Sequence, residues 1–333
     1  LDDFESSAIS YPQFLDQIYE PFERDSPNLR PYQQEAVETV VAKLKIFDRG
    51  QLLMACGTGK TFVTLWIWEA LNVQTTLIFL PSLNLLAQTL REWTSNSSNS
   101  FEVLCVCSDG SVGVGSTPED MKPEDAPFDV TSDVSVIHNF LRGGNKKVIF
   151  GTYQSSGLIG DAQRDGVVDL IICDEAHRCA GPASSSFTQV LDDERINSKK
   201  RLFTTATPRI FSKPVKSSIE KNDQVFYGMQ DESKFGPVFH TYSFGRAISE
   251  KWLTDYQVVV VGVAKSEVKD SIQKRDLVNS PSGLVTDVED VAVKMSLLKA
   301  VRNYGLKRLL TFHSRVSRAK SFAREFLDVL ALL

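Results

Sequence analysis

Short runs of consecutive apolar residues, separated by segments of helical length, constrain the fold of this chain more than any other feature. The apolar residues in each run are continuous rather than alternating, so each predicted strand has two faces that must be covered. Amphipathic segments such as TFVTLWIWEALN (61–72) and PSLNLLAQTLREW (81–93) lie between the runs. The pattern predicts an α/β fold with a parallel sheet flanked by helices. The predicted strands are QLLMA (51–55), TTLIFL (75–80), FEVLCVC (101–107), KVIFGT (147–152), VVDLIIC (167–173) and RLFTT (201–205).

A second set of elements follows a long irregular stretch near the carboxyl end of the sequence. We therefore expect a first domain at 29–250 and the beginning of a second α/β domain at 251–333. Residues 1–28, which contain three prolines, are predicted to be a linker or N-terminal extension. The elements predicted for the second domain are strands at 257–263 and 308–313 and helices at 288–305 and 317–330.

Composition is that of a globular protein, with 42% hydrophobic and 24% charged residues. No run of eighteen apolar residues and no signal-peptide pattern is present, so we expect neither a membrane partner nor secretion. The net charge of −5 is unusual for a nucleic-acid-binding protein but allows a local basic track. An odd number of cysteines without C-x-x-C spacing disfavours zinc or disulfides and favours a cytoplasmic location. The cysteines are Cys56, Cys105, Cys107, Cys173 and Cys179.

A glycine-rich segment follows the first predicted strand and precedes a predicted helix. At such a junction, backbone N–H groups and the helix N-terminus can bind a phosphate, with Lys60 neutralising it and Thr61 binding Mg²⁺. The strict spacing G-x-x-x-x-G-K-[ST] fails, because Met54 stands where a glycine is required. The alternative is a glycine turn before a surface lysine. The candidate phosphate-binding residues are Gly57, Thr58, Gly59, Lys60 and Thr61.

Two carboxylates, Asp174 and Glu175, and then His177 follow the apolar run at 167–173. The carboxyl end of a strand is the ligand-binding edge of an open α/β sheet. There Asp174 is suited to hold Mg²⁺ and Glu175 to activate a water molecule. The alternative interpretation is a capping cluster at the start of a helix.

Two further polar segments complete the set. TTATPR (204–209) follows the last strand of the first domain, and its alternative is a threonine-rich turn. LRPYQQ (29–34) precedes the first strand, and its alternative is an exposed helix start. A glutamine such as Gln33 can bind both the donor and the acceptor on one edge of adenine.

These four segments, in this order, resemble a superfamily 2 helicase or translocase motor of the DEAH-box type, a pair of RecA-like domains. Its phosphate loop often reads A-x-x-G-x-G-K-[ST], which accommodates Met54. The resemblance covers about residues 29–325 and implies ATP and Mg²⁺ as cofactors. For the nucleotide, the resemblance implies adenine binding by Arg30 and Gln33 and phosphate binding by Gly57, Thr58, Gly59, Lys60 and Thr61. It implies Mg²⁺ binding by Thr61 and Asp174 and catalysis by Lys60, Asp174, Glu175 and His177. It implies that His177, Thr205 and Thr207 couple the nucleotide state to DNA binding.

The same resemblance implies a track for a DNA backbone. FLPSLNLLAQ (79–88), GTYQSS (151–156) and LLTFHSRVSRAK (309–320) match DNA-contacting motifs of the superfamily. The alternative for each is an ordinary polar turn after a strand. Contacts to phosphates carry no sequence information, so the target sequence would be read elsewhere. The implied contact residues are Ser82, Gln88, Thr152, Gln154, Ser314 and Arg315.

Three longer stretches are similar to the motors of single-polypeptide type I restriction–modification enzymes. They are CDEAHRCAG, TYQSS and FGPVFHTYSFGRAISEKWLTDYQVVVVGV. This similarity implies a translocase acting on double-stranded DNA, with covalently linked nuclease and methyltransferase or target-recognition domains outside this chain. The alternatives are a stand-alone DNA-repair or RNA helicase, and a nucleotide-gated DNA-binding module.

One feature of the superfamily is absent from the sequence. The Q-x-x-G-R-x-x-R-like segment, which supplies an arginine finger, does not occur in these 333 residues. An arginine finger contributes a large factor to phosphoryl transfer. We therefore expect this chain alone to bind Mg-ATP and to hydrolyse it poorly.

Overall fold

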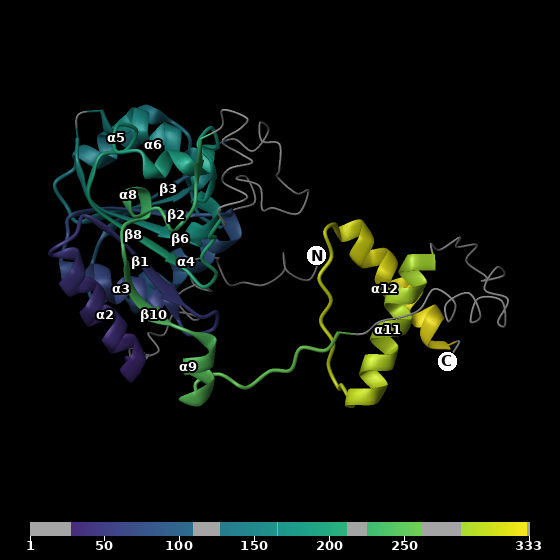
Figure 1. The fold of residues 1–333 in the computed structure, drawn as a ribbon. Coiled ribbons are helices and arrows are strands. Elements are labelled where there is room, and N and C mark those ends of the chain that lie inside the picture. Colours follow the sequence, from purple (N-terminus) through teal and green to yellow (C-terminus); the bar gives the residue numbers. More distant parts are fainter. Residues whose placement is uncertain (1–27, 109–126, 165, 212–224, 261–287, 332–333) are drawn as a thin grey trace, which may run out of the picture. The chain divides into compact units, whose positions relative to one another are not determined.

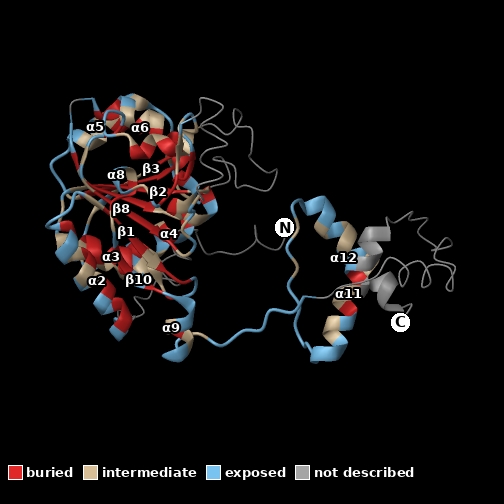
Figure 2. Cartoon of the chain, viewed as in Figure 1, coloured by how far each residue is buried: buried red, intermediate tan, exposed pale blue. Residues whose placement is uncertain are grey.

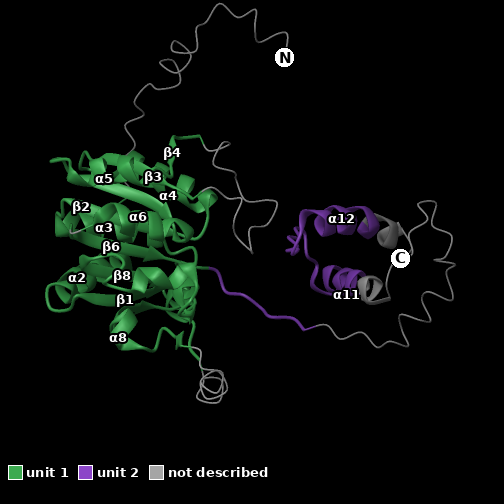
Figure 3. Cartoon of the chain, turned by 90° about the horizontal axis from the view of Figure 1, so that it is seen from above, with its two compact units in different colours: residues 1–114, 120–253 green, residues 115–119, 254–333 purple. Residues whose placement is uncertain are grey.

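The computed structural model describes residues 28–108, 127–164, 166–211, 225–260 and 288–331. The chain forms two compact units, one of Leu1–Val114 and Asp120–Leu253 and one of Gly115–Glu119 and Thr254–Leu333 (Figure 3). All but the last residue of the predicted extension at 1–28 lies outside the described residues. Among the described residues, no helix combines the length and the apolar character needed to span a bilayer.

Unit 1 is built on an eight-stranded sheet in the order β10-β1-β8-β6-β2-β5-β3-β4, and every pair in it is parallel (Figure 1). This architecture confirms the predicted α/β fold, and each of the six runs predicted for the first domain forms a strand. A separate antiparallel pair joins β7 (Gly181–Pro182) to β9 (Phe226–Tyr227). The strands of the main sheet are β1 Arg49–Met54, β2 Thr75–Leu80, β3 Glu102–Val106, β4 Val130–Thr131, β5 Lys147–Thr152, β6 Val168–Asp174, β8 Ser198–Thr205 and β10 Val238–Tyr242.

Both faces of the sheet are buried, as the continuous apolar runs require (Figure 2). On β2, Leu77 and Phe79 belong to one apolar cluster, whereas Ile78 and Leu80 belong to a cluster on the opposite face. Each fully buried side chain of this size contributes about 1.5–3 kcal/mol to the stability of the folded state.

The helices of unit 1 are α2 Pro31–Leu44, α3 Lys60–Leu71, α4 Leu83–Asn96, α5 Val134–Arg142, α6 Ser156–Gln163, α8 Glu232–Phe235 and α9 Phe244–Ser249, with short 3₁₀ turns η2 Tyr153–Ser155, η3 Ala176–Cys179 and η4 Ser186–Leu191.

Strand β10 was not among the predicted strands. It pairs with β1 at the edge of the sheet, with Met54 opposite Tyr242. Its sequence VFHTY mixes apolar and polar residues, because Val238 at the strand's start is exposed while Phe239 and His240 are buried. A short mixed strand of this kind has neither the continuous nor the alternating pattern by which strands are predicted.

Unit 2 contains two helices, α11 (Val288–Tyr304) and α12 (Val316–Ala331), which agree with the predicted helices. The two predicted strands are wrong as far as the structure describes them: residues 257–260 and 308–313 have no regular secondary structure, and 261–263 lie outside the described residues. A strand exists only when its backbone groups bond to a neighbour. Within the described part of unit 2, no strand is present to act as that neighbour.

Gly236 provides a test of how the edge of the sheet is held. Its φ is +69°, and a Cβ at this position would lie 2.2 Å from the Arg49 carbonyl oxygen. We predict that Gly236→Ala lowers the free energy of unfolding by about 3 kcal/mol, because backbone atoms must move to admit the methyl group. All four tryptophans lie in unit 1, so urea unfolding followed by tryptophan fluorescence measures this change.

The matched control is Gly144→Ala. A Cβ at Gly144 would meet nothing within 4 Å, so we expect a change within about 0.5 kcal/mol. Equal unfolding midpoints for the two variants would show that the close approach at Gly236 is not a constraint.

Candidate nucleotide-binding and catalytic site

Three polar segments meet at the carboxyl edge of the sheet. Strands β1, β8 and β6 are neighbours, and the glycine loop, the threonine segment and the two carboxylates follow them. In the register, Thr205 lies opposite Leu53 and Thr204 lies opposite Asp174. Because parallel strands end at the same edge, residues distant in sequence are brought together there.

The glycine loop turns directly into α3. Gly57 and Gly59 both have φ of +80°, a conformation that favours glycine, and the Thr58 hydroxyl donates to the Ala55 carbonyl at 2.6 Å. Gly59 is the residue that precedes the helix, and Lys60 is the first residue in it. The first turn of α3 therefore presents free N–H groups beside a lysine, as anion sites at helix N-termini do.

Glu175 lies at the centre of a polar cluster. Its carboxylate is 3.9 Å from Lys60 Nζ and 3.3 Å from His177 Nδ1. The Thr205 hydroxyl is 2.9 Å from His177 Nδ1 and donates to Glu175 Oε2 at 3.4 Å, and Thr207 N–H donates to the same hydroxyl oxygen at 3.2 Å. The hydrogen bond from His177 and the charge of Lys60 hold the pKa of the Glu175 carboxyl below its usual range.

The backbone of Glu175 is itself unusual. Its φ of 50° and ψ of 46° place a non-glycine residue in the left-handed region. Such a conformation persists only where the surrounding contacts hold it, and these positions are concentrated at functional sites.

Asp174 has a different environment from its neighbour. The Thr204 hydroxyl donates to Asp174 Oδ1 at 2.7 Å, and the Tyr153 hydroxyl donates to the Asp174 carbonyl at 2.7 Å. Burial raises the pKa of the Asp174 carboxyl, and the Thr204 hydrogen bond opposes that shift. A divalent cation would stabilise the ionised form of such a carboxylate.

The oxygen donors at this edge fit Mg²⁺. The Thr61 hydroxyl and the Asp174 carboxylate are the ligand types that this ion prefers, and it commonly keeps water and phosphate oxygens as its other ligands. In the described part of the chain, no three or more His, Cys, Asp or Glu side chains gather to hold a metal by themselves.

The start of α2 contacts the glycine loop. Gln33 Nε2 donates to the Thr58 carbonyl at 3.0 Å, and a Cβ at Gly59 would lie 2.6 Å from this nitrogen. Gln33 Oε1 accepts from the Arg30 N–H at 3.0 Å. Each of the two polar atoms of the Gln33 amide keeps one further bonding position, which an adenine edge can use.

The residues expected to contact DNA are distributed over both units. Thr152 is the last residue of β5 and Ser82 follows the neighbouring strand β2, at the same edge as the glycine loop. Ser82 is the N-cap of α4 and accepts from Leu85 N–H at 3.4 Å, whereas Thr152 is buried with its hydroxyl 3.2 Å from Ser155 Oγ. Gln88 is exposed and donates to Glu92.

Three more residues of this set are exposed on the surface. Gln154 lies in η2 of unit 1. Ser314 and Arg315 precede α12 of unit 2.

Sequence reasoning missed residues that support the predicted ones. Tyr32 donates its hydroxyl to the Thr58 carbonyl at 3.0 Å, although its place beside Gln33 was a usable signal. Thr204 and Tyr153 hold Asp174; they lie in the segments TTATPR and GTYQSS, whose sequence signal was present, but neither residue was given a role.

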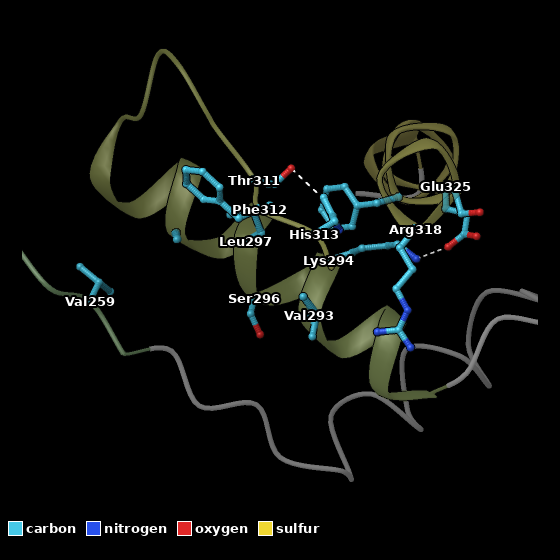
Figure 4. Close-up of a pocket in the computed structure, with 13 residues that line it drawn as sticks. Val259, Val293, Lys294, Ser296, Leu297, Thr311, Phe312, His313, Arg318 and Glu325 are labelled. Carbon is cyan, nitrogen blue, oxygen red and sulfur yellow. Dashed lines mark hydrogen bonds and ion pairs between the residues drawn. The ribbon is translucent and has the colours of Figure 1, made fainter. Parts of the chain in front are cut away.

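A cavity of about 540 Å³ lies in unit 2 between α11, α12 and the segment that contains His313 (Figure 4). Lys294 forms an ion pair with Glu325 at its wall, and His313 packs on Phe322 with ring centroids 4.8 Å apart. None of the predicted site residues lines it.

Comparison with known proteins decides the family. Residues 26–210 match the model of the family described as "Type III restriction enzyme, res subunit". The chain belongs to this family. The match contains the glycine loop and both carboxylates.

Solved structures of restriction enzymes are similar to the chain. One is the "ATP-dependent Type ISP restriction-modification enzyme LlaBIII bound to DNA", with 33% identity, a TM-score of 0.73 and coverage of 92% of this chain and 22% of that one. Another is a nuclease-deletion mutant of the Type ISP enzyme LlaGI, also with 33% identity, a TM-score of 0.55 and coverage of 75% and 21%.

Curated relatives include "Probable helicase A859L" of African swine fever virus. The protein of the isolate Tick/South Africa/Pretoriuskop Pr4/1996 is 29% identical over 305 residues, and that of the strain Badajoz 1971 Vero-adapted is 28% identical. The match covers 90% of this chain but 31% of each relative, so the chain spans about a third of their length. Together these matches show a helicase-type ATPase domain of superfamily 2 that resembles restriction-enzyme motors.

Thr205 allows a test of the polar cluster. We predict that Thr205→Val lowers the rate of ATP turnover roughly tenfold, because it removes the hydroxyl that joins Glu175, His177 and Thr207. Nucleotide affinity should change little, since Thr205 makes no contact with the glycine loop in the structure. Steady-state hydrolysis and ADP titration separate the two effects.

Thr94→Val is the matched control, because that hydroxyl is exposed and bonds only to carbonyls of its own helix. A turnover rate equal to wild type in Thr205→Val would remove the cluster from the mechanism.

Proposed function

We propose that the chain is the ATP-driven motor of a DNA restriction or phage-defence enzyme and that it moves along double-stranded DNA. The observation that supports it most is the meeting of Lys60, Glu175 and the His177–Thr205 pair at one edge of the sheet. The chain's likeness to two Type ISP restriction enzymes, one of them bound to DNA, favours a restriction enzyme over other helicases.

The phosphates of ATP would bind at the glycine loop, where Lys60 neutralises their charge and the N-terminus of α3 supplies N–H donors. Thr61 and Asp174 would hold Mg²⁺, which supplies charge neutralisation between the phosphates. Glu175, kept ionised by its contacts with Lys60 and His177, orients a water molecule and accepts its proton. Arg30 and Gln33 bind the adenine.

Coupling to DNA would follow from the shared hydrogen bonds of the cluster. A change at Glu175 during hydrolysis alters the partner of the Thr205 hydroxyl, and Thr207 N–H bonds to that same hydroxyl. Ser82, Gln88, Thr152 and Gln154 of unit 1 and Ser314 and Arg315 of unit 2 would contact the DNA backbone.

The wider assignment has three parts. The first RecA-like domain extends over 29–250, a second begins at 251, and residues 1–28 are a linker or N-terminal extension. Nuclease and methyltransferase or target-recognition domains are covalently linked partners. The protein acts in the cytoplasm.

A stand-alone DNA-repair or RNA helicase is the second candidate, which the viral "Probable helicase" relatives favour. A nucleotide-gated DNA-binding module is a third, and the presence of Glu175 counts against it, because a module that does not hydrolyse ATP needs no residue to activate a water molecule.

The first experiment compares ATP hydrolysis by the full-length protein with and without linear double-stranded DNA. We expect duplex DNA to stimulate hydrolysis at least about tenfold and Glu175→Gln to abolish it, since removing a general base costs about 10²-fold or more. Glu38→Gln makes the same chemical change at an exposed position on α2 and serves as the matched control, which should hydrolyse ATP as the wild type does. Stimulation by single strands or RNA alone would support the stand-alone helicase instead.

Cys56 provides an independent test of where the nucleotide binds. This exposed thiol directly precedes Gly57, whereas Cys105, Cys173 and Cys179 are buried, and burial raises the pKa of Cys105 to about 12. We predict that a maleimide modifies Cys56 ahead of these three and that MgADP slows its modification. Peptide mass spectrometry measures the rate at each cysteine, and an unchanged rate at Cys56 with saturating MgADP would contradict binding at this loop.

A further inference from the structure

The segment at which the chain leaves unit 1 is attached to residues that border the proposed nucleotide site. This exit segment, residues 250–253, folds back on α9 because Trp252 and Leu253 both donate their N–H groups to the Ala247 carbonyl. The ring centroids of Trp252 and Tyr32 are 5.5 Å apart. Leu253 reaches the glycine loop, where a Cβ at Gly57 would lie 3.4 Å from its Cδ2 atom.

Tyr32 joins this segment to the glycine loop. Its hydroxyl donates to the Thr58 carbonyl at 3.0 Å, and its ring stacks on Tyr242 with centroids 4.2 Å apart and planes 2° from parallel. The Tyr242 hydroxyl donates to Glu250 at 2.8 Å, so Glu250 and Trp252 of the exit segment contact the same aromatic pair. The exit segment therefore contacts the loop directly through Leu253 and indirectly through Tyr32.

Arg30 is held by Trp252 and Tyr32 together. Its guanidinium carbon lies 4.9 Å from the centroid of the Trp252 ring, and one of its nitrogens donates to the Tyr32 hydroxyl at 3.3 Å. A guanidinium is planar and stacks on aromatic rings, so fixing it in this way gives a flat surface suited to a purine. Gln33, whose amide bonds to the Arg30 N–H, lies beside it.

Trp252 is not needed to attach α9 to the rest of unit 1. Arg246 of α9 already forms a two-pronged ion pair with Glu35 of α2, at 3.1 and 2.6 Å, and a further bond to Glu250 at 2.7 Å. The Trp252 residue is 39% exposed, so it is not part of the buried core of unit 1.

We propose that Trp252 is a positioning residue of the adenine site, which holds Arg30 against the base and thereby links base binding to the exit segment. The inference rests on the proposed function, because it takes Arg30 and Gln33 as the adenine-binding residues. Its consequence is specific: Trp252 should affect ligands that contain a base and should not affect ligands that contain phosphates alone.

Calorimetric titration of the wild type, Trp252→Ala and Trp252→Phe with MgADP and with magnesium tripolyphosphate tests this consequence. We expect Trp252→Ala to bind MgADP about fivefold more weakly and tripolyphosphate with unchanged affinity. Trp252→Phe, which keeps an aromatic face, should bind MgADP within about twofold of wild type. Trp66→Ala, which removes a partly buried tryptophan packed on Phe62 of α3, is the matched control.

Amide hydrogen exchange of the peptide that contains the exit segment provides the second measurement. In the wild type, MgADP should slow exchange there more than tripolyphosphate does, and in Trp252→Ala the two ligands should have the same effect. This difference between the two ligands measures the link between base binding and the exit segment. If Trp252 had a purely structural role, its substitution would not remove the difference.

The outcomes separate the two proposals. If the wild type binds MgADP and Trp252→Ala binds it equally well, or loses both ligands equally, the inference is wrong and the proposed function stands. If the wild type binds neither ligand, the proposed function is wrong and the inference is wrong with it.

Discussion

The hydrogen-bonded pairing of β1, β8 and β6 sets the distances on which the site depends. Asp174 bonds to Thr204 because the two are opposite each other in the ladder, and Thr205 reaches Glu175 because it is the next residue along β8. A slip of one residue in β8 would turn these side chains to the opposite faces of the sheet. Burial of both faces opposes such a slip, since it would displace Leu202 and Phe203 from separate apolar clusters. Packing of the core therefore fixes the strand register, and the register fixes which side chains meet at the carboxyl edge of the sheet.

Two carboxylates that are adjacent in sequence acquire opposite properties at this edge. Burial raises the pKa of Asp174, while His177 and Lys60 lower the pKa of Glu175. The left-handed backbone at Glu175 marks the end of the strand and the change from one environment to the other. Carboxylates with divergent environments can take different roles, and those we propose here are a metal ligand and an acceptor of a proton from water. The strained backbone is therefore part of how two similar residues become distinct.

Sequence reasoning was most successful where the information is local or periodic. The apolar runs of unit 1 identified six strands, and the position of Asp174 and Glu175 after an apolar run placed them at the carboxyl edge of the sheet. It failed for contacts that depend on how distant segments dock. The stack of Tyr32 on Tyr242 joins residues 210 positions apart on α2 and β10, and β10 itself has no periodic signal. Such pairs become visible only in three dimensions.

Unit 2 shows the same distinction within one segment of sequence. Helices α11 and α12 agree with prediction because the hydrogen bonds of a helix lie within the helix. The apolar run at 308–313 lacks a pairing partner among the described residues, and Phe312 is left 90% exposed and Leu310 78% exposed. Exposed apolar side chains of this size are unfavourable in water, and a paired strand under a helix layer would bury them. An apolar run forms a strand only when a neighbouring strand pairs with it. The described residues provide such neighbours in unit 1 and none in unit 2, so the same apolar pattern predicted strands correctly in unit 1 and not in unit 2.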